Sequence, residues 1–163
     1  MRDLFIALTL IPLGCLAESV VIMPAEVLLN QPEGWELKSK DSYPEAPSNV
    51  CFPRLEKGGT RIDCVIWKDA PSLEIALNQY LARLPAILGK EATYEVVEQE
   101  SFSAASGIKG LKSMIRIKRT PDCGSIDLVR YIFRNKHHQI VCLGGVGDLN
   151  EIHRLTIASL STK

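Results

Sequence analysis

The sequence predicts an α+β domain in which helices pack on an antiparallel twisted sheet. Three long segments in the C-terminal half alternate apolar and polar residues, as half-buried strands do. A Gly-Gly turn joins two earlier segments of the same kind, and two further segments carry apolar residues at helical spacing. The chain has 163 residues and is 46% apolar, which is ordinary for one globular domain and excludes a wholly disordered chain. We expect a single α+β domain over residues 18–163.

Residues 1–17 (MRDLFIALTLIPLGCLA) have the features of an export signal. Arg2 precedes an apolar run over residues 4–13, which is much shorter than the roughly 20 residues of a membrane span. Small residues at Cys15 and Ala17 predict cleavage before Glu18 and a periplasmic or secreted mature chain. An alternative stays open, because Leu13-Gly14-Cys15 resembles part of a bacterial lipobox. Lipidation of Cys15 would make the protein a membrane-anchored lipoprotein.

The first part of the mature chain is expected to form short strands and one hairpin. The hairpin turn is Lys57–Thr60. With Lys57-Gly58 as its loop, Cys51 lies directly opposite Cys64. With Gly58-Gly59 as its loop, the cysteines become diagonal neighbours and Arg54 faces Asp63. Both registers bring the cysteines near disulfide distance. The strands expected in this part are Val20–Met23, Glu26–Asn30, Trp35–Lys38, Val50–Glu56 and Arg61–Lys68.

Four cysteines remain after cleavage, and an even number in an exported chain predicts two disulfides. We expect one between Cys51 and Cys64. A turn at Asn135-Lys136 would place Cys142 opposite Val129, about 20 Å along the strand from Cys123. A Cys123–Cys142 disulfide therefore needs a loop that folds back, and a crossed connectivity is the alternative.

Two helices are expected. Asp69 or Ser72 caps the first and Pro85 stops it; its apolar stripe is Leu73, Leu77, Tyr80, Leu81 and Leu84. The second begins at Asp148, which forms a capping box with Glu151. The second half also predicts strands over residues 94–100, 111–119, 126–134 and 137–143, with a flexible segment over residues 101–110. Because one sheet face is basic, we expect the helices on the other face.

The order of these elements resembles the PsbP-like superfamily. The resemblance rests on a strand that leads into Pro-Glu-Gly-Trp (Pro32–Trp35), a helix that begins Ser72-Leu73, three meandering strands, and a last helix that ends in Ser159-Leu160. It spans most of residues 26–161. That group includes the photosystem II extrinsic protein and the bacterial periplasmic lipoprotein DcrB. The resemblance implies an α/β/α sandwich with an accessory or binding role rather than catalysis, and the two expected disulfides are not part of its pattern.

The charges of the chain cancel overall but not locally. Residues 18–105 carry 8 basic and 14 acidic side chains, whereas residues 106–163 carry 10 basic and 4 acidic ones. Five basic residues fall on the faces of two neighbouring strands: Lys112, Arg116, Lys118, Arg130 and Arg134. If the two faces coincide, they form a patch for a protein partner that carries carboxylates or phosphates. Otherwise they belong to a solvated sheet face that the acidic half partly neutralises. Glutamate at both 116 and 130 is expected to weaken capture of the partner without unfolding the domain.

No residue pattern predicts a catalytic, cofactor or metal site. The glycines at 144, 145 and 147 precede Asp148, whose charge would repel a phosphate, so we interpret them as a turn into a capped helix. His137 and His138 would point to opposite faces of a strand and cannot share one metal ion there.

The sequence therefore favours an exported, non-enzymatic accessory or protein-binding module. One alternative is a periplasmic immunity or inhibitor protein that blocks a secreted toxic enzyme, and another is a cell-envelope hydrolase that uses His138 or His153. The zero net charge argues against nucleic acid as a partner. A membrane is expected as a partner only if Cys15 is lipidated.

Overall fold

A computed structural model describes residues 18–67, 70–89, 91–120 and 124–162. Its helices are α1 (Leu73–Leu88) and α2 (Leu149–Ser159), and a short 3₁₀ turn covers Lys40–Ser42. The first five strands are β1 (Glu18–Ile22), β2 (Val27–Gln31), β3 (Glu36–Lys38), β4 (Val50–Lys57) and β5 (Thr60–Trp67). The other five are β6 (Thr93–Ser103), β7 (Lys109–Lys118), β8 (Ser125–Arg134), β9 (Ile140–Val146) and β10 (Ser161–Thr162).

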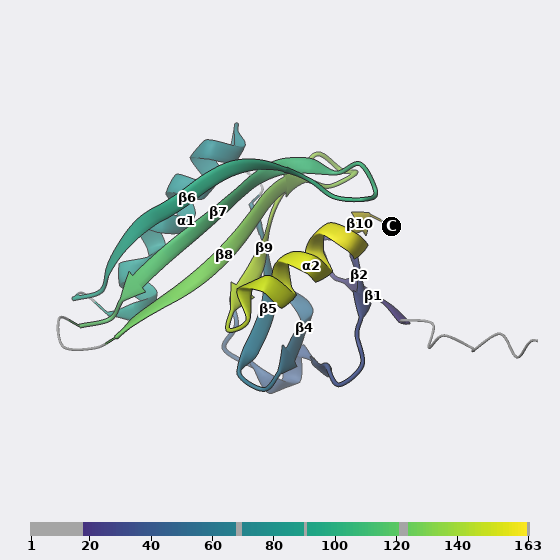
Figure 1. The fold of residues 1–163 in the computed structure, drawn as a ribbon, viewed down its shortest axis with the longest axis horizontal. Coiled ribbons are helices and arrows are strands. Elements are labelled where there is room, and N and C mark those ends of the chain that lie inside the picture. Colours follow the sequence, from purple (N-terminus) through teal and green to yellow (C-terminus); the bar gives the residue numbers. More distant parts are fainter. Residues whose placement is uncertain (1–17, 68–69, 90, 121–123, 163) are drawn as a thin grey trace, which may run out of the picture.

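The strands form two antiparallel sheets. The large sheet has the order β3-β4-β5-β9-β8-β7-β6, and a small sheet has the order β1-β2-β10. Helix α1 packs on one face of the large sheet, and α2 lies on the opposite face together with the small sheet (Figure 1). This arrangement confirms the α+β fold class. It corrects the expectation that the helices share one face, because the large sheet buries apolar side chains on both.

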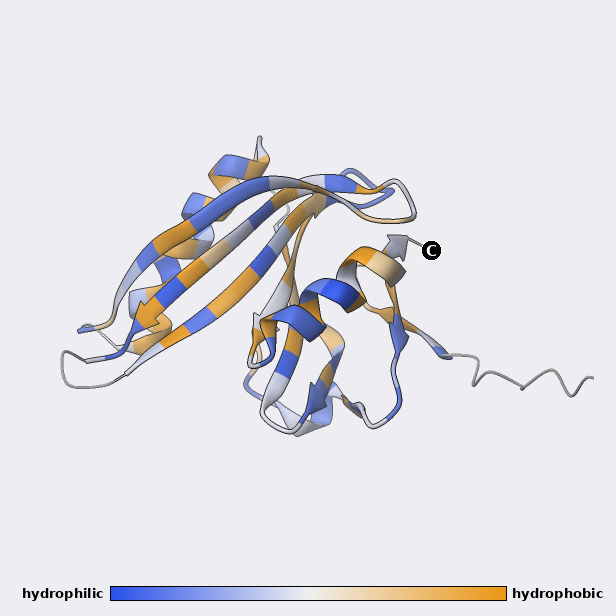
Figure 2. Ribbon diagram, in the orientation of Figure 1, coloured by the Kyte–Doolittle hydropathy of each residue, from blue (hydrophilic) through white to orange (hydrophobic). Residues whose placement is uncertain are grey.

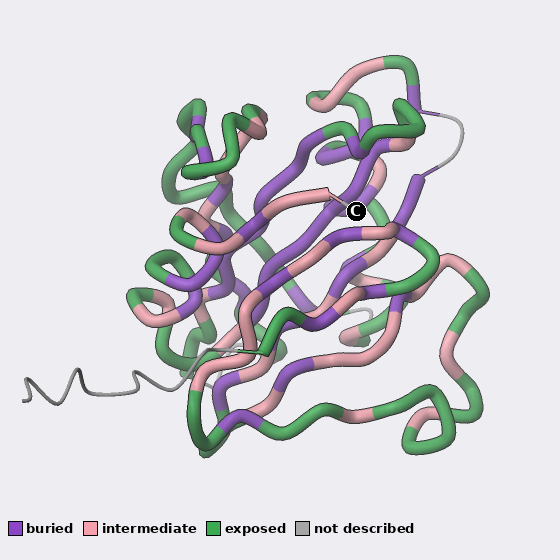
Figure 3. The backbone as a smooth tube through the Cα atoms, turned by 90° about the vertical axis from the view of Figure 1, so that its right-hand side faces the viewer, coloured by how far each residue is buried: buried purple, intermediate pink, exposed green. Residues whose placement is uncertain are grey.

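Two apolar clusters therefore hold the domain together. Ile152 and Leu155 of α2 pack with Tyr131 and Phe133 in the first, and α1 packs with Ile132 in the second. Alternate residues of β8 thus enter different clusters, and hydrophilic and hydrophobic bands alternate along the long strands (Figure 2). Buried residues concentrate in the inner strands, and exposed residues gather in the loops and on the outside (Figure 3).

Helix α1 begins where the sequence predicts but ends later. The Ser72 hydroxyl accepts a hydrogen bond from the Ile75 amide (3.2 Å), which confirms Ser72 as the cap; Asp69 lies outside the described residues. The expected stop at Pro85 is wrong, since the helix continues to Leu88. A proline in the last turn removes only one hydrogen bond. The helix ends instead at Gly89, whose φ of 112° few other residues adopt.

The β4–β5 hairpin contains both of the registers that the sequence left open. Next to the turn, Lys57 pairs with Thr60, so Gly58-Gly59 is the loop. Beyond a β-bulge between Cys51 and Leu55, the register shifts and Cys51 lies directly opposite Cys64. Pro53 lies inside the bulge, where its missing N–H removes a ladder hydrogen bond. The second register predicts that Arg54 faces Asp63. The bulge breaks that register, and the two residues are not paired.

The loop between β8 and β9 is longer than expected. Arg134 pairs with Ile140, so the loop comprises residues 135–139 and contains both His137 and His138. The buried Asn135 holds it, because its Oδ1 accepts hydrogen bonds from the amides of His137 and Gln139. Consequently Cys142 lies opposite Ile132 and not opposite Val129.

The segment over residues 101–110, expected to be flexible, is half strand and half turn. Strand β6 extends to Ser103 and β7 begins at Lys109, which leaves a short turn over residues 104–108. Across the turn, the Ala104 amide donates a hydrogen bond to the carbonyl of Ile108. The neighbouring amide of Ala105 donates to the carbonyl of Ile157 on α2. These bonds connect the turn to the second helix.

The glycines before α2 belong mainly to a strand. Gly144 and Gly145 lie inside β9, and Gly147 alone lies in the turn that leads to α2. Asp148 caps the helix as expected, since its carboxylate accepts a hydrogen bond from the Glu151 amide (3.0 Å). The Glu151 side chain does not complete the capping box but accepts from Trp35 Nε1 (3.2 Å). No helix in the described part of the chain is long and apolar enough to cross a membrane.

Candidate functional site

Three of the five predicted partner-binding residues share one surface of the large sheet. Lys112, Arg116 and Lys118 alternate along β7 and point to the same side as Tyr131 of β8, which packs near α2. Helix α2 lies in front of one end of this side, and none of the elements in the described part of the chain lies in front of the other end of β6–β8 (Figure 1). We call this uncovered surface of β6, β7 and β8 the open face.

Arg116 is the centre of an ion-pair cluster on the open face. Its Nε and Nη2 donate to the two carboxylate oxygens of Asp127 on β8, at 2.8 and 3.0 Å. Its Nη1 donates to Glu95 of β6 at 3.4 Å. The two parallel bonds to Asp127 are the geometry in which a guanidinium holds a carboxylate best. The hydrogen bond from Arg116 lowers the pKa of Asp127 below its usual value.

Lys112, four residues before Arg116 on β7, forms a second ion-pair cluster. Its Nζ lies 2.6 Å from a carboxylate oxygen of Glu100 and 3.7 Å from one of Glu98, both on β6. The hydrogen bond from Lys112 lowers the pKa of Glu100. The open face therefore carries rows of alternating charge and not a basic patch. Three of its acidic residues, Glu95, Glu98 and Glu100, come from the acidic half of the chain, in line with the neutralised-face alternative, and Asp127 comes from the basic half.

The remaining two predicted residues lie on the opposite face of the sheet, beside α1. Arg130 pairs with Ser113 in register and is 6% exposed, beneath Tyr80 of α1. Arg134 donates to the carbonyl of Pro71, just before α1 (3.0 Å). The structure thus does not bring the five basic residues together. Since Arg130 is buried and paired with Asp63, we now expect glutamate at position 130 to destabilise the fold rather than leave it intact.

Three of the four cysteines expected in disulfides, Cys51, Cys64 and Cys142, lie in the described residues, and all three are buried. Cys51 and Cys64 face each other across the hairpin, but both are free thiols in this structure, as is Cys142. Cys142 points into the α1 cluster, whereas Cys64 points into the α2 cluster, so a direct Cys64–Cys142 crossing does not fit the sheet. Cys123 lies outside the described residues, and a Cys123–Cys142 disulfide stays a prediction.

The histidines are dispersed. His137 Nε2 lies 3.0 Å from a carboxylate oxygen of Glu26, and His153 Nδ1 lies 2.7 Å from the Tyr131 hydroxyl. His138 sits exposed in the 135–139 loop with a φ of 60°. Across the described ranges, no three His, Cys, Asp or Glu side chains are grouped as a metal site would require.

Comparison with solved structures identifies the architecture. The solution structure of cyanobacterial PsbP (CyanoP) from Synechocystis sp. PCC 6803 matches with a TM-score of 0.66, covering 93% of this chain and 96% of that one. The chain has a PsbP-like fold. The sequence identity is 11%, so the likeness shows the fold alone. No family model matches the sequence, and no curated protein is significantly similar to it.

The PsbP-like fold confirms the resemblance that the element order indicates. The sequence pattern did not predict that Glu95, Glu98 and Glu100 share the open face with the basic residues of β7. The signal was present, because a strand rich in glutamate lies next in sequence to a strand rich in lysine and arginine.

Proposed function

We propose that the protein is an exported, non-enzymatic accessory module that binds a protein partner through the open face. The observation that carries the proposal is an uncovered surface of three long strands on which ion pairs hold charged side chains in fixed positions. Arg116 and Lys118 are both exposed there. Charge rows of this kind contribute chiefly to the specificity and rate of association with a partner of complementary pattern. The PsbP-like fold is compatible with this role.

Export is proposed from the sequence of residues 1–17, in which Arg2 precedes a short apolar run and small residues precede the expected cleavage after Ala17. Cleavage there leaves every described element in the mature chain. The test is the mass of the protein recovered from the cell envelope. A chain that begins at Glu18 supports secretion, a chain that begins at a lipid-modified Cys15 supports the anchored alternative, and an uncut chain in the cytoplasm contradicts export.

The partner is tested by affinity capture with the mature chain on envelope extract of the native host. The variant R116A/K118A removes two exposed charges of the open face. The control K40A/R154A removes two exposed charges elsewhere, in the 3₁₀ turn and on α2. We expect the first variant to lose the captured protein and the control to retain it. Equal capture by both contradicts the open face as the binding surface.

The captured protein also distinguishes the two alternative functions. If it is an enzyme that the mature chain inhibits, the module is an immunity or inhibitor protein. Turnover by the mature chain in a broad hydrolase screen, abolished by His153→Ala or His138→Ala, would instead establish a hydrolase and overturn the non-enzymatic role.

A further inference from the structure

The side of the large sheet beneath α1 contains a cavity that is separate from the open face. Its volume is about 410 Å³, within the range of about 300–1,000 Å³ of small-molecule sites. The C-terminal half of α1 forms one wall, and side chains from β4, β5, β9, β8 and β7 form the floor. The cavity and the open face lie on opposite faces of β7, so a ligand in the cavity does not occupy the open face.

Most of the cavity wall is apolar. The principal side chains are Leu84, Ile87 and Leu88 of α1 and Ile117, Ile126 and Leu128 of the sheet. Ile87 is 71% exposed and Ile126 is 43% exposed, so large apolar side chains continue from the interior of the cavity onto the surface. Apolar cavities hold water poorly and accept apolar ligands, and exposed apolar groups that adjoin a cavity mark a binding site.

Four arginines line the same cavity, whereas Asp63 is the one acidic residue among its described lining. Asp63 is already paired, since its Oδ1 lies 2.5 Å from Arg130. Arg61 Nε lies 3.6 Å from the other oxygen of Asp63, within ion-pair range but too far for a hydrogen bond. The Nε atoms of Arg54 and Arg61 are buried with no hydrogen-bond acceptor within the described chain. The fourth, Arg119, is exposed. The lining thus has a surplus of guanidinium groups.

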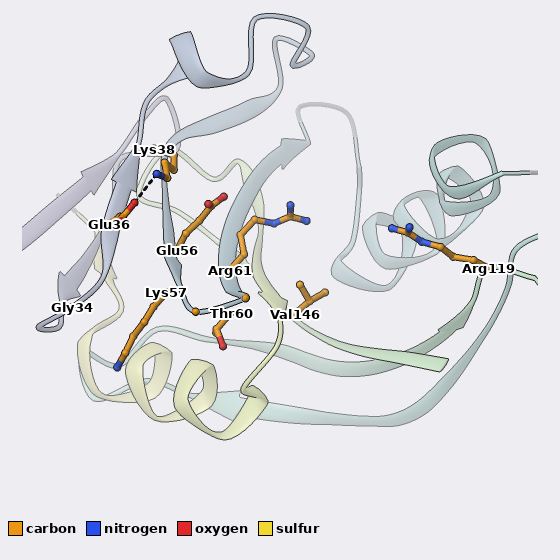
Figure 4. Close-up of a pocket in the computed structure, with 11 residues that line it drawn as sticks. Gly34, Glu36, Lys38, Glu56, Lys57, Thr60, Arg61, Arg119 and Val146 are labelled. Atoms are coloured by element: carbon orange, nitrogen blue, oxygen red, sulfur yellow. Dashed lines mark hydrogen bonds and ion pairs between the residues drawn. The ribbon is translucent and has the colours of Figure 1, made fainter. Parts of the chain in front are cut away.

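A second, more polar pocket of about 500 Å³ adjoins the cavity and shares Arg61, Arg119 and Val146 with it. Figure 4 shows the side chains of Arg61 and Arg119 pointing toward one another from opposite sides of this pocket. Lys38 and Lys57 also line this pocket, together with Glu36 and Glu56, and Lys38 is paired with Glu36 at 2.6 Å. The two arginines therefore stand where an apolar interior meets a polar opening.

We propose that the cavity binds an amphipathic anion with one hydrocarbon chain, represented by a long-chain carboxylate. The chain lies against the α1 wall and the apolar floor, and the carboxylate lies between Arg61 and Arg119. A guanidinium binds a carboxylate through two parallel hydrogen bonds, which a neutral head group cannot accept in the same way. The cavity lies at the small end of the range for ligand sites, which favours one chain over two.

The test titrates the mature chain with sodium dodecanoate below its micelle-forming concentration, followed by calorimetry. Dodecanol has the same chain without the charge, and acetate has the charge without the chain. We expect saturable binding of dodecanoate, at least tenfold weaker binding of dodecanol, and no binding of acetate. Absence of saturable dodecanoate binding overturns the proposal, and equal affinity for dodecanol overturns the role of the arginines.

Two matched pairs of variants locate the site. R61Q/R119Q is expected to weaken dodecanoate binding at least tenfold, while K40Q/R154Q leaves it unchanged. I87E places a negative charge at the exposed mouth and is expected to weaken binding similarly, whereas I75E, on the first turn of α1, does not. All these positions are at least partly exposed, and circular dichroism checks that each variant folds. Wild-type affinity of both R61Q/R119Q and I87E overturns the site.

Discussion

Arg130 Nη1 lies 2.5 Å from Asp63 Oδ1 beneath α1, although the strand β9 separates the two strands that carry them. Asp63 and Arg130 both pair with Gly144, so the three residues form one row across the sheet. Because Gly144 has no side chain, nothing in the row separates the guanidinium from the carboxylate. The Arg130 Nε also donates to the Tyr80 hydroxyl (2.9 Å). Burial lowers the pKa of Arg130, but the charge and hydrogen bond of Asp63, together with Tyr80 and Cys142, raise it, and the pKa lies well above its usual value.

Removal of Arg130 should strongly destabilise the domain. Arg130→Met leaves the Asp63 carboxylate buried without its main partner, for which a loss of about 3 kcal/mol in the free energy of unfolding is typical. Urea unfolding measures the loss. Arg116→Met is the control, because its ion pairs are exposed and water replaces them; we expect a much smaller loss.

The double variant D63N/R130M separates the ion pair from other effects of the arginine. Neutral asparagine at 63 no longer leaves a buried charge, so the double variant should be more stable than R130M alone. If R130M loses no more stability than R116M, or if D63N does not recover part of the loss, the buried pair does not have the role that the structure indicates.

Alanine at Gly145 should disrupt the sheet. A Cβ at this position would lie 1.6 Å from the carbonyl oxygen of Arg61 on the neighbouring strand, which the backbone cannot accommodate without moving. We expect Gly145→Ala to be poorly soluble or to unfold at much lower urea concentration. Gly124→Ala is the matched control, because no atom lies within 4 Å of a Cβ there. Equal stability of the two variants would contradict the close packing of β5 and β9.

The positions of the elements were predictable from local pattern. The alternation along 111–119 and 126–134 matches β7 and β8 within two residues, and the stripe from Leu73 to Leu84 matches the buried side of α1. These signals reside in consecutive residues and need no knowledge of neighbours. The two-residue strand β10 was missed, since it forms only by pairing with β2.

The location of the candidate sites was not predictable in the same way. The basic patch depended on which faces of β7 and β8 coincide, and a one-residue change of register reverses that answer. Likewise, one of the two predicted hairpin registers places Asp63 opposite Arg54, but the bulge at Pro53 breaks that register and Asp63 reaches Arg130, 67 residues away. The arginine-lined cavity combines residues from five strands and α1, so no local motif marks it.

Export should convert Cys51 and Cys64 into a disulfide. Residues directly opposite in an antiparallel pair have Cα atoms about 4.5–5.5 Å apart, which a disulfide spans. In protein recovered from the envelope and unfolded in urea, both cysteines should resist alkylation until a reductant is added. Reduction should lower the stability by about 3 kcal/mol, as expected for a loop of this length.

The double variant C51A/C64A is the control, because it lacks the Cys51–Cys64 disulfide; a reductant should lower its stability by about 3 kcal/mol less than that of wild type. Cys142 is a useful internal comparison: burial raises the pKa of its thiol to about 12, so in the folded chain it should not react with alkylating agents at pH 8. Alkylation of Cys51 and Cys64 in urea without reductant would contradict the disulfide.

Acid should weaken the ion pairs of the open face in a defined pH range. The hydrogen bond from Arg116 lowers the pKa of Asp127 in the folded chain below its value in the unfolded chain. A lowered carboxyl pKa contributes stability that is fully present above the unfolded value, about 4, and is lost as the pH falls through the folded value. Arg116→Gln removes that contribution, so wild type should exceed the variant in stability at pH 7 and approach it as the pH falls below about 4. Urea unfolding at several pH values measures the difference, with Lys40→Gln as the control. A difference between wild type and Arg116→Gln that is the same at pH 7 and pH 2 would show that the Asp127 pair does not contribute through its charge.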